Sequence, residues 1–121
     1  MAGRFCVTLT NCMQDPDKAT VAFVVANAAL GCEKETMVFL SSDGVLAAIK
    51  GEYDKIDVGE PFSPLKELVE KFVAGGGKIL ACTPCVIKRD YAVEDLVSGA
   101  ELAGGAALVE WLSDDPACVG Y

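Results

Sequence analysis

Segments with a strand pattern alternate with segments with a helix pattern along this chain, and this alternation constrains the fold most. Residues 4–10 alternate apolar and polar side chains, as a half-buried strand does, and Asp15-Pro16 then provides an N-cap and a first helical residue. The expected strands cover residues 4–10, 36–40, 78–81, 100–103 and 117–119, and the expected helices cover residues 15–30, 45–50, 63–74 and 106–112. This order predicts parallel strands joined by right-handed crossovers.

We therefore expect an α/β fold, a doubly wound, mainly parallel five-stranded sheet with helices on both faces, arranged as a flavodoxin-like three-layer sandwich. The 121 residues contain neither an internal repeat nor a linker, which predicts a single domain over residues 1–121. Residues 51–62 are polar with scattered Gly and Pro and predict a surface loop. The helix at residues 15–30 is apolar on nearly all sides, a pattern that indicates a subunit interface and hence a homo-oligomer.

Composition and charge exclude several classes of partner. The net charge is −8, and the ten basic residues form no cluster, which argues against nucleic acid and against an anionic membrane surface. The N-terminus lacks the apolar core of a signal peptide, and no apolar run reaches the length of a membrane span. We therefore expect a cytoplasmic protein whose six cysteines are free thiols.

The pair Cys82-Thr83-Pro84-Cys85 follows the expected strand at residues 78–81 and precedes a segment that can open a helix. Unpaired N–H groups at a helix start favour thiolate over thiol, and Lys88 or Arg89 would add positive charge. The chain has no histidine, which excludes Ser-His-Asp and Cys-His catalysis. The pattern favours thiol chemistry, with Cys82 as the expected thiolate and Thr83 beside it.

Two further segments are expected at the same edge of the sheet, because the carboxyl ends of parallel strands meet there. Asn11 and Cys12 follow the first strand, and Ser42 and Asp43 follow the second. Ser42 and Asp43 could hold a polar group, or they could form only a turn with a helix cap. Cys12 and the cysteine pair would give a zinc ion three ligands without a fourth, so we expect neither a metal nor a cofactor.

The order and spacing of several segments, taken together over nearly the whole chain, resemble the DsrE/DsrF-like family. The segments that carry the resemblance are Thr10-Asn11, residues 15–20, Val38-Phe39-Leu40 with Asp43-Gly44-Val45, residues 64–68, residues 76–80 with Cys82-x-x-Cys85, residues 94–96 and residues 107–110. The resemblance implies a doubly wound domain assembled as a trimer or hexamer. It also implies that Cys82 carries sulfur as a persulfide and that Arg89 occupies a common basic position. Thr83-Pro84 and Lys88-Arg89-Asp90 depart from the usual family pattern.

Three functions follow as hypotheses. The first is a sulfur carrier, in which Cys82 takes sulfur from a donor protein and passes it to an acceptor protein, with Cys85 able to resolve the persulfide. The second is a dithiol–disulfide redox protein that uses Cys82 and Cys85 as an exchanging pair. The third is a non-catalytic oligomeric binding module in which the cysteines are incidental.

Overall fold

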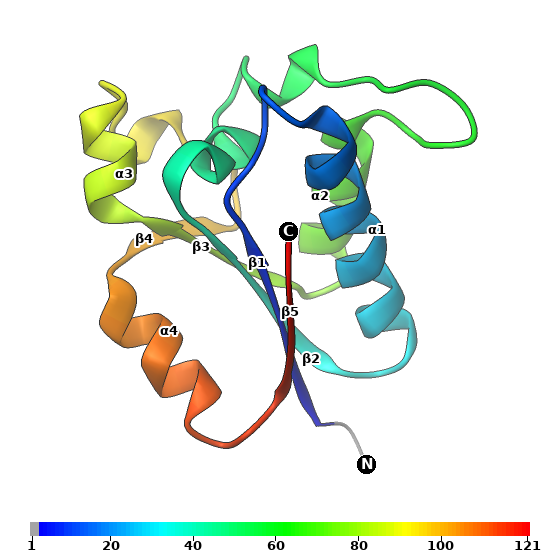
Figure 1. The fold of residues 1–121 in the computed structure, drawn as a ribbon, viewed down its shortest axis with the longest axis vertical. Coiled ribbons are helices and arrows are strands. Elements are labelled where there is room, and N and C mark those ends of the chain that lie inside the picture. The colour runs from blue at the N-terminus through cyan, green and yellow to red at the C-terminus, as the bar shows by residue number, and fades with distance from the viewer. Residues whose placement is uncertain (1–2) are drawn as a thin grey trace.

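The computed structural model describes residues 3–121, and within them five parallel strands form one sheet (Figure 1). The strands are β1 (Arg4–Leu9), β2 (Glu35–Leu40), β3 (Lys78–Cys82), β4 (Ala100–Ala103) and β5 (Ala117–Gly120). Their order, which the sequence left open, is β4-β3-β2-β1-β5. The expected α/β fold with a five-stranded sheet is therefore confirmed, and all of its strand pairs are parallel.

Helices cover both faces of the sheet, as expected. On one face α1 (Pro16–Gly31) packs beside α2 (Leu65–Ala74), and α4 (Gly105–Leu112) lies on the other face (Figure 1). The expected N-cap of α1 is present, because the Lys18 N–H donates to Asp15 Oδ1 at 3.2 Å. Shorter helical segments lie between these elements: η1 (Ser42–Ala48), η2 (Tyr53–Lys55), α3 (Thr83–Lys88) and η3 (Val93–Asp95).

The register of the sheet aligns the carboxyl ends of the central strands. Leu9 of β1 pairs with Leu40 of β2, and Leu40 pairs with Ala81 of β3. The segments that follow these strands therefore meet at one edge of the sheet, where η1 contacts α3. Strands β1 to β4 lie side by side in chain order. The connection after β4 then crosses back, so that β5 pairs with the other side of β1.

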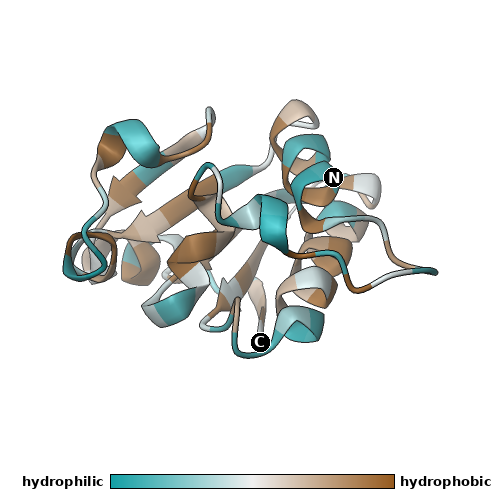
Figure 2. Cartoon of the chain, turned by 90° about the horizontal axis from the view of Figure 1, so that it is seen from above, coloured by the Kyte–Doolittle hydropathy of each residue, from teal (hydrophilic) through white to brown (hydrophobic). Residues whose placement is uncertain are grey.

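Alternation along the strands divides the hydrophobic core into two layers. Val7, Val38 and Ile79 face α1 and α2, where Phe23 and Phe72 meet edge to face with ring centroids 5.8 Å apart. The alternate positions face α4 and pack with Trp111; they are Cys6, Met37, Phe39 and Leu80. Figure 2 shows these hydrophobic strands lying between the helices.

Two local predictions were wrong in part. The helix expected at residues 45–50 is the 3-10 helix η1, which begins earlier, at Ser42. The surface loop expected at residues 51–62 contains η2 and sends Tyr53 and Ile56 into the core, because an aromatic and an aliphatic side chain among polar neighbours still favour burial. No helix in residues 3–121 is long and apolar enough to cross a membrane.

Candidate functional site

The cysteine pair lies at the junction of β3 and α3, where the sequence placed it. Cys82 is the last residue of β3 and the N-cap of α3, and Cys85 lies in the first turn of that helix. Both are free thiols and are half-buried. Thr83 Oγ1 donates to the carbonyl oxygen of Ala103 at 3.2 Å, which ties the start of α3 to the end of β4. This anchor fixes the position of the pair on the sheet edge.

The start of η1 supplies a hydrogen bond to the pair. The Ser42 N–H donates to Cys85 Sγ at 3.2 Å. Ser42 has a φ of 52°, a left-handed conformation that residues other than glycine rarely adopt. A strained backbone held against a reactive side chain is typical of functional sites. The Ser-Ser-Asp-Gly turn therefore does more than cap a helix, since it directs an amide at a thiol.

Gly44 permits this placement of Ser42, and sequence reasoning missed its role. A Cβ on Gly44 would lie 2.1 Å from the carbonyl oxygen of Leu9, at the end of β1. The Ser41 N–H donates to the same oxygen at 3.1 Å. Only glycine allows η1 to approach the end of β1 this closely. The Asp-Gly dipeptide in the sequence signalled a turn, but it gave no sign of this contact.

An ion pair lies over the same thiol. Arg89 Nε contacts Asp43 Oδ1 at 3.2 Å, and Arg89 Nη1 donates to the carbonyl oxygen of Cys85 at 3.2 Å. The Arg89 and Asp43 side chains are only about a quarter exposed, at 25% and 26%. Since both partners are held by η1 and α3, the guanidinium is fixed close to the cysteine pair.

The pKa values of the two thiols are shifted in opposite directions. Burial raises the pKa of Cys82, and its hydrogen bond to Cys85 raises it further. Burial also opposes ionisation of Cys85, but hydrogen bonds from the Cys82 thiol and the Ser42 N–H, with the charges of Arg89 and Lys88, lower its pKa overall. These directions favour Cys85 over the expected Cys82 as the thiolate, and the role of Cys82 stays a prediction. The Ser42 N–H comes from the start of η1, and Lys88 and Arg89 lie at the end of α3.

The remaining predicted site residues do not all contact the cysteine pair. Cys12 does not face solvent at the sheet edge; it is fully buried, and burial, together with the charges of Asp43 and Glu52, raises its pKa to about 12. Asn11 donates only to Thr10 Oγ1, at 3.4 Å, among the hydrogen bonds of residues 3–121. Lys88 is exposed and acts on Cys85 through its charge alone. In the described part of the chain, no group of three or more Cys, Asp or Glu side chains could hold a metal ion.

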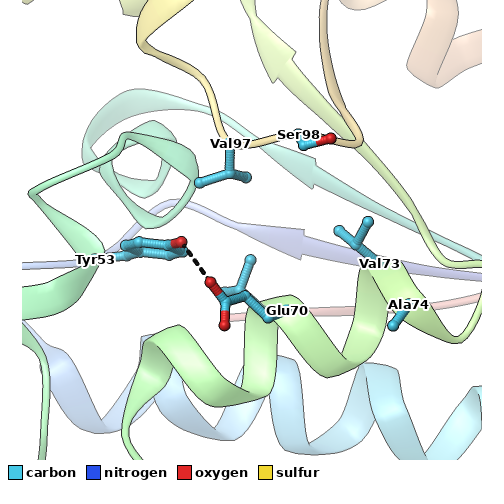
Figure 3. A pocket seen from close by; sticks show the side chains of 7 residues that line it. Tyr53, Glu70, Val73, Ala74, Val97 and Ser98 are labelled. Carbon is cyan, nitrogen blue, oxygen red and sulfur yellow. Dashed lines mark hydrogen bonds between the residues drawn. The ribbon is translucent and has the colours of Figure 1, made fainter.

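A separate hollow of about 250 Å³ lies between η2, the end of α2 and the segment before β4 (Figure 3). Tyr53 donates to Glu70 Oε2 at 3.1 Å across it, and Val73 and Val97 form its apolar walls. Val73 precedes β3 and Val97 precedes β4, so this hollow lies toward the amino ends of these strands. The cysteine pair follows the carboxyl end of β3 and is not part of it.

The fold and this edge define a class: a three-layer α/β protein with a thiol pair directly after β3. Residues 4–119 match the model of the DsrE/DsrF-like family, and the chain belongs to that family, as the sequence resemblance predicted. The solved structures of the ychN protein from E. coli and of MTH1491, a protein of unknown function from Methanobacterium thermoautotrophicum, are similar over 100% of both chains. Their TM-scores are 0.78 and 0.70 at 22% and 15% identity, which shows the fold alone.

Two archaeal relatives are similar in sequence. The uncharacterized protein MK0008 of Methanopyrus kandleri is 30% identical over 89% of this chain and 85% of its own length. The uncharacterized protein MJ0760 of Methanocaldococcus jannaschii is 32% identical over 80% of this chain. The matched region covers only 35% of the Methanocaldococcus protein, so this chain spans about a third of it.

Proposed function

We propose that this chain is a sulfur carrier in which Cys85 accepts sulfur as a persulfide and Cys82 is the resolving thiol. Membership of the DsrE/DsrF-like family supports a sulfur-relay type of protein. The observation that carries the proposal is the 3.2 Å hydrogen bond from the Ser42 N–H to Cys85 Sγ, beside the Arg89–Asp43 ion pair. The assignment differs from the resemblance, which implies Cys82 as the carrier.

The transfer is a thiol exchange without net oxidation. The Cys85 thiolate attacks the outer sulfur of a donor persulfide, R–S–SH, and a new S–S bond forms as the S–S bond of the donor breaks. The donor leaves as a thiolate, R–S⁻, and the chain holds Cys85–S–SH. An acceptor thiolate then attacks the outer sulfur and releases the Cys85 thiolate. Alternatively, Cys82 attacks Cys85 Sγ, releases HS⁻ and closes a disulfide that an external thiol must reduce.

The contacts at Cys85 favour both the acceptance of sulfur and its transfer to an acceptor. A persulfide ionises readily, and its negative charge needs hydrogen-bond donors and a nearby cation. The Ser42 N–H and the Arg89 guanidinium supply these to Cys85. Because Cys85 is only half-buried, a donor persulfide can reach it. The good leaving ability of a low-pKa thiolate also favours passing the sulfur on.

Labelling with a defined low-molecular-weight persulfide, followed by intact and peptide mass spectrometry, tests the proposal. Cys82→Ser is expected to gain one sulfur at Cys85 and to retain it, because the resolving thiol is missing. Cys85→Ser is expected to gain none at the cysteine pair. Cys32→Ser is the matched control, since Cys32 is an exposed thiol in a different part of the chain, at the C-cap of α1. It should label as the wild type does.

Two results would overturn the proposal in different ways. No sulfur on any variant would reject a sulfur carrier. Sulfur retained by Cys85→Ser on Cys82, and lost from Cys82→Ser, would keep the carrier but return the accepting role to Cys82.

A dithiol–disulfide redox protein is the second candidate, and one contact favours it. Cys82 and Cys85 lie together at the start of α3, and each acts on the pKa of the other, so oxidation can pair them. This candidate predicts a reversible disulfide between Cys82 and Cys85 with a potential in the range of cytosolic dithiols. Titration against glutathione buffers, followed by peptide mapping, would reject it if the two cysteines fail to pair.

The homo-oligomer, a trimer or a hexamer, remains part of the proposal. The side of α1 that faces away from the sheet supports it, because Val24 is 36% exposed on this surface helix. Beside it, an apolar hollow is lined by Phe5, Val25, Ala28 and Ala29. Apolar surface on a helix that is already packed on its other side is typical of contact with a second copy of the same chain.

A further inference from the structure

The chain holds a second pair of neighbouring cysteines, far from the CxxC pair in the sequence. Cys6 of β1 and Cys118 of β5 are direct register partners in two adjacent parallel strands. Paired positions in a sheet place their side chains on the same face, and here it is the face covered by α4. The Cys118 side chain is near enough to raise the pKa of Cys6.

The spacing of the two strands suits a covalent link. Adjacent strands lie about 4.8 Å apart, and the Cα atoms of disulfide-bonded cysteines lie roughly 4.4–6.8 Å apart. The register therefore brings the two Cα atoms within the range that disulfides span. In the sequence 111 residues lie between Cys6 and Cys118, and their pairing depends on the strand order, which the sequence left open.

The two thiols differ in accessibility. Cys6 is fully buried among Met37, Leu80 and Trp111, and burial, together with its contact to Cys118, raises its pKa to about 12. Cys118 is exposed, as are all four residues of β5. An external reagent therefore meets Cys118 first, with Cys6 directly behind it. This arrangement is that of an attacking thiol and a resolving thiol.

We propose that Cys118 and Cys6 form a second thiol–disulfide site, whose substrates are low-molecular-weight disulfides such as oxidised glutathione. The Cys118 thiolate attacks one sulfur of the disulfide R–S–S–R, forms a mixed disulfide and releases R–S⁻. Cys6 then loses its proton and attacks Cys118 Sγ, which releases the second R–S⁻ and closes the Cys6–Cys118 bond. The two protons of the chain's thiols pass to the two leaving thiolates, so one external disulfide is reduced to two thiols.

The proposed Cys6–Cys118 disulfide would join two strands at the edge of the sheet. β5 pairs with β1, and the Tyr121 N–H donates to the Thr8 carbonyl oxygen at 2.8 Å just beyond it. A Cys6–Cys118 disulfide adds a covalent link between this edge strand and its neighbour β1. Reaction at this site is independent of the CxxC pair, and the proposal stands or falls without the sulfur-carrier function.

The test uses the full chain with Cys32, Cys82 and Cys85 replaced by Ser, so that the thiols left are Cys6, Cys12 and Cys118. Oxidised glutathione is added at low protein concentration and then removed. Intact mass spectrometry should show a loss of two hydrogens, and peptide mapping should place the bond between Cys6 and Cys118. Trp111 is the only tryptophan and packs with Cys6, so its fluorescence should fall as the neighbouring disulfide forms.

Two matched variants separate formation of the mixed disulfide from its resolution by Cys6. Cys118→Ser changes an exposed residue and should show complete loss of both the mass change and the fluorescence change. Cys6→Ala should keep one glutathionyl group on Cys118 and form no internal bond. A parent protein that stops at the mixed disulfide, or that forms only dimers through Cys118, would overturn the proposal. So would an unchanged fluorescence response in Cys118→Ser.

Discussion

Replacing Gly44 with alanine tests how the site is built. A Cβ at this position would lie 2.1 Å from the Leu9 carbonyl oxygen and 2.7 Å from its carbon. Non-bonded carbon and oxygen need about 3 Å, so η1 and the end of β1 must separate by about 1 Å. The neighbouring atoms belong to the backbone, and no side-chain rotation can relieve the overlap.

The overlap sets the expected loss of stability in Gly44→Ala. Overpacking that forces the backbone to move costs about 1–3 kcal/mol, and we expect the upper end, about 3 kcal/mol, because both partners belong to the sheet edge. For 121 residues this corresponds to a fall in Tm of roughly 10 °C. The shift would also draw the Ser42 N–H away from Cys85 Sγ. Losing about 1 kcal/mol of thiolate stabilisation would slow alkylation of Cys85 about fivefold.

Urea unfolding measures the first effect, and residue-resolved alkylation with iodoacetamide at neutral pH measures the second. Gly31→Ala is the matched control, because no atom lies within 4 Å of a Cβ built at the end of α1. It should be neutral or stabilising by up to about 1 kcal/mol.

Two outcomes would refute this reasoning. If the unfolding free energy of Gly44→Ala stayed within about 0.5 kcal/mol of the wild type, η1 would not approach β1 as closely as described. If stability fell while the alkylation rate of Cys85 did not change, the Ser42 N–H would not govern the reactivity of Cys85.

Three further predictions concern the core, pH and assembly. Phe72→Ala should lower the unfolding free energy by about 3–5 kcal/mol in urea, since Phe72 is fully buried; a loss below 1 kcal/mol would contradict it. Cys6 and Cys12 have a pKa raised from 9.0 to about 12, so unfolding releases their protons and stability should fall by about 3 kcal/mol between pH 8 and pH 10. A free energy of unfolding that does not change between pH 8 and pH 10 would contradict this prediction. Val24→Asp should dissociate the oligomer in sedimentation; a monomeric wild type would reject the assembly.

Local signals were enough to predict most of the fold. Asp15-Pro16 marked the start of α1, and the strand at residues 100–103 was confirmed at both ends. These features depend on near neighbours in the sequence, such as caps, turns and alternation. The same reasoning placed Cys82 at the end of β3, because the apolar run and the following Pro84 are contiguous with it.

Contacts between distant segments could not be predicted in this way. The lowered pKa of Cys85 depends on Ser42 and Arg89, which reach it from η1 and from the end of α3, and neither contact is visible without three-dimensional positions. Cys12 follows β1 as expected, yet its side chain turns into the core. The pairing of Cys6 with Cys118 requires knowledge of the strand order.

We propose Cys85 as the reactive thiolate of the pair. A pH titration of alkylation rates, resolved by residue through peptide mass spectrometry, distinguishes Cys85 from Cys82. We expect Cys85 to be alkylated at lower pH than Cys82, and we expect Arg89→Gln to move the transition of Cys85 to higher pH. Alkylation of Cys82 at the lower pH, or a Cys85 transition unchanged by Arg89→Gln, would contradict it.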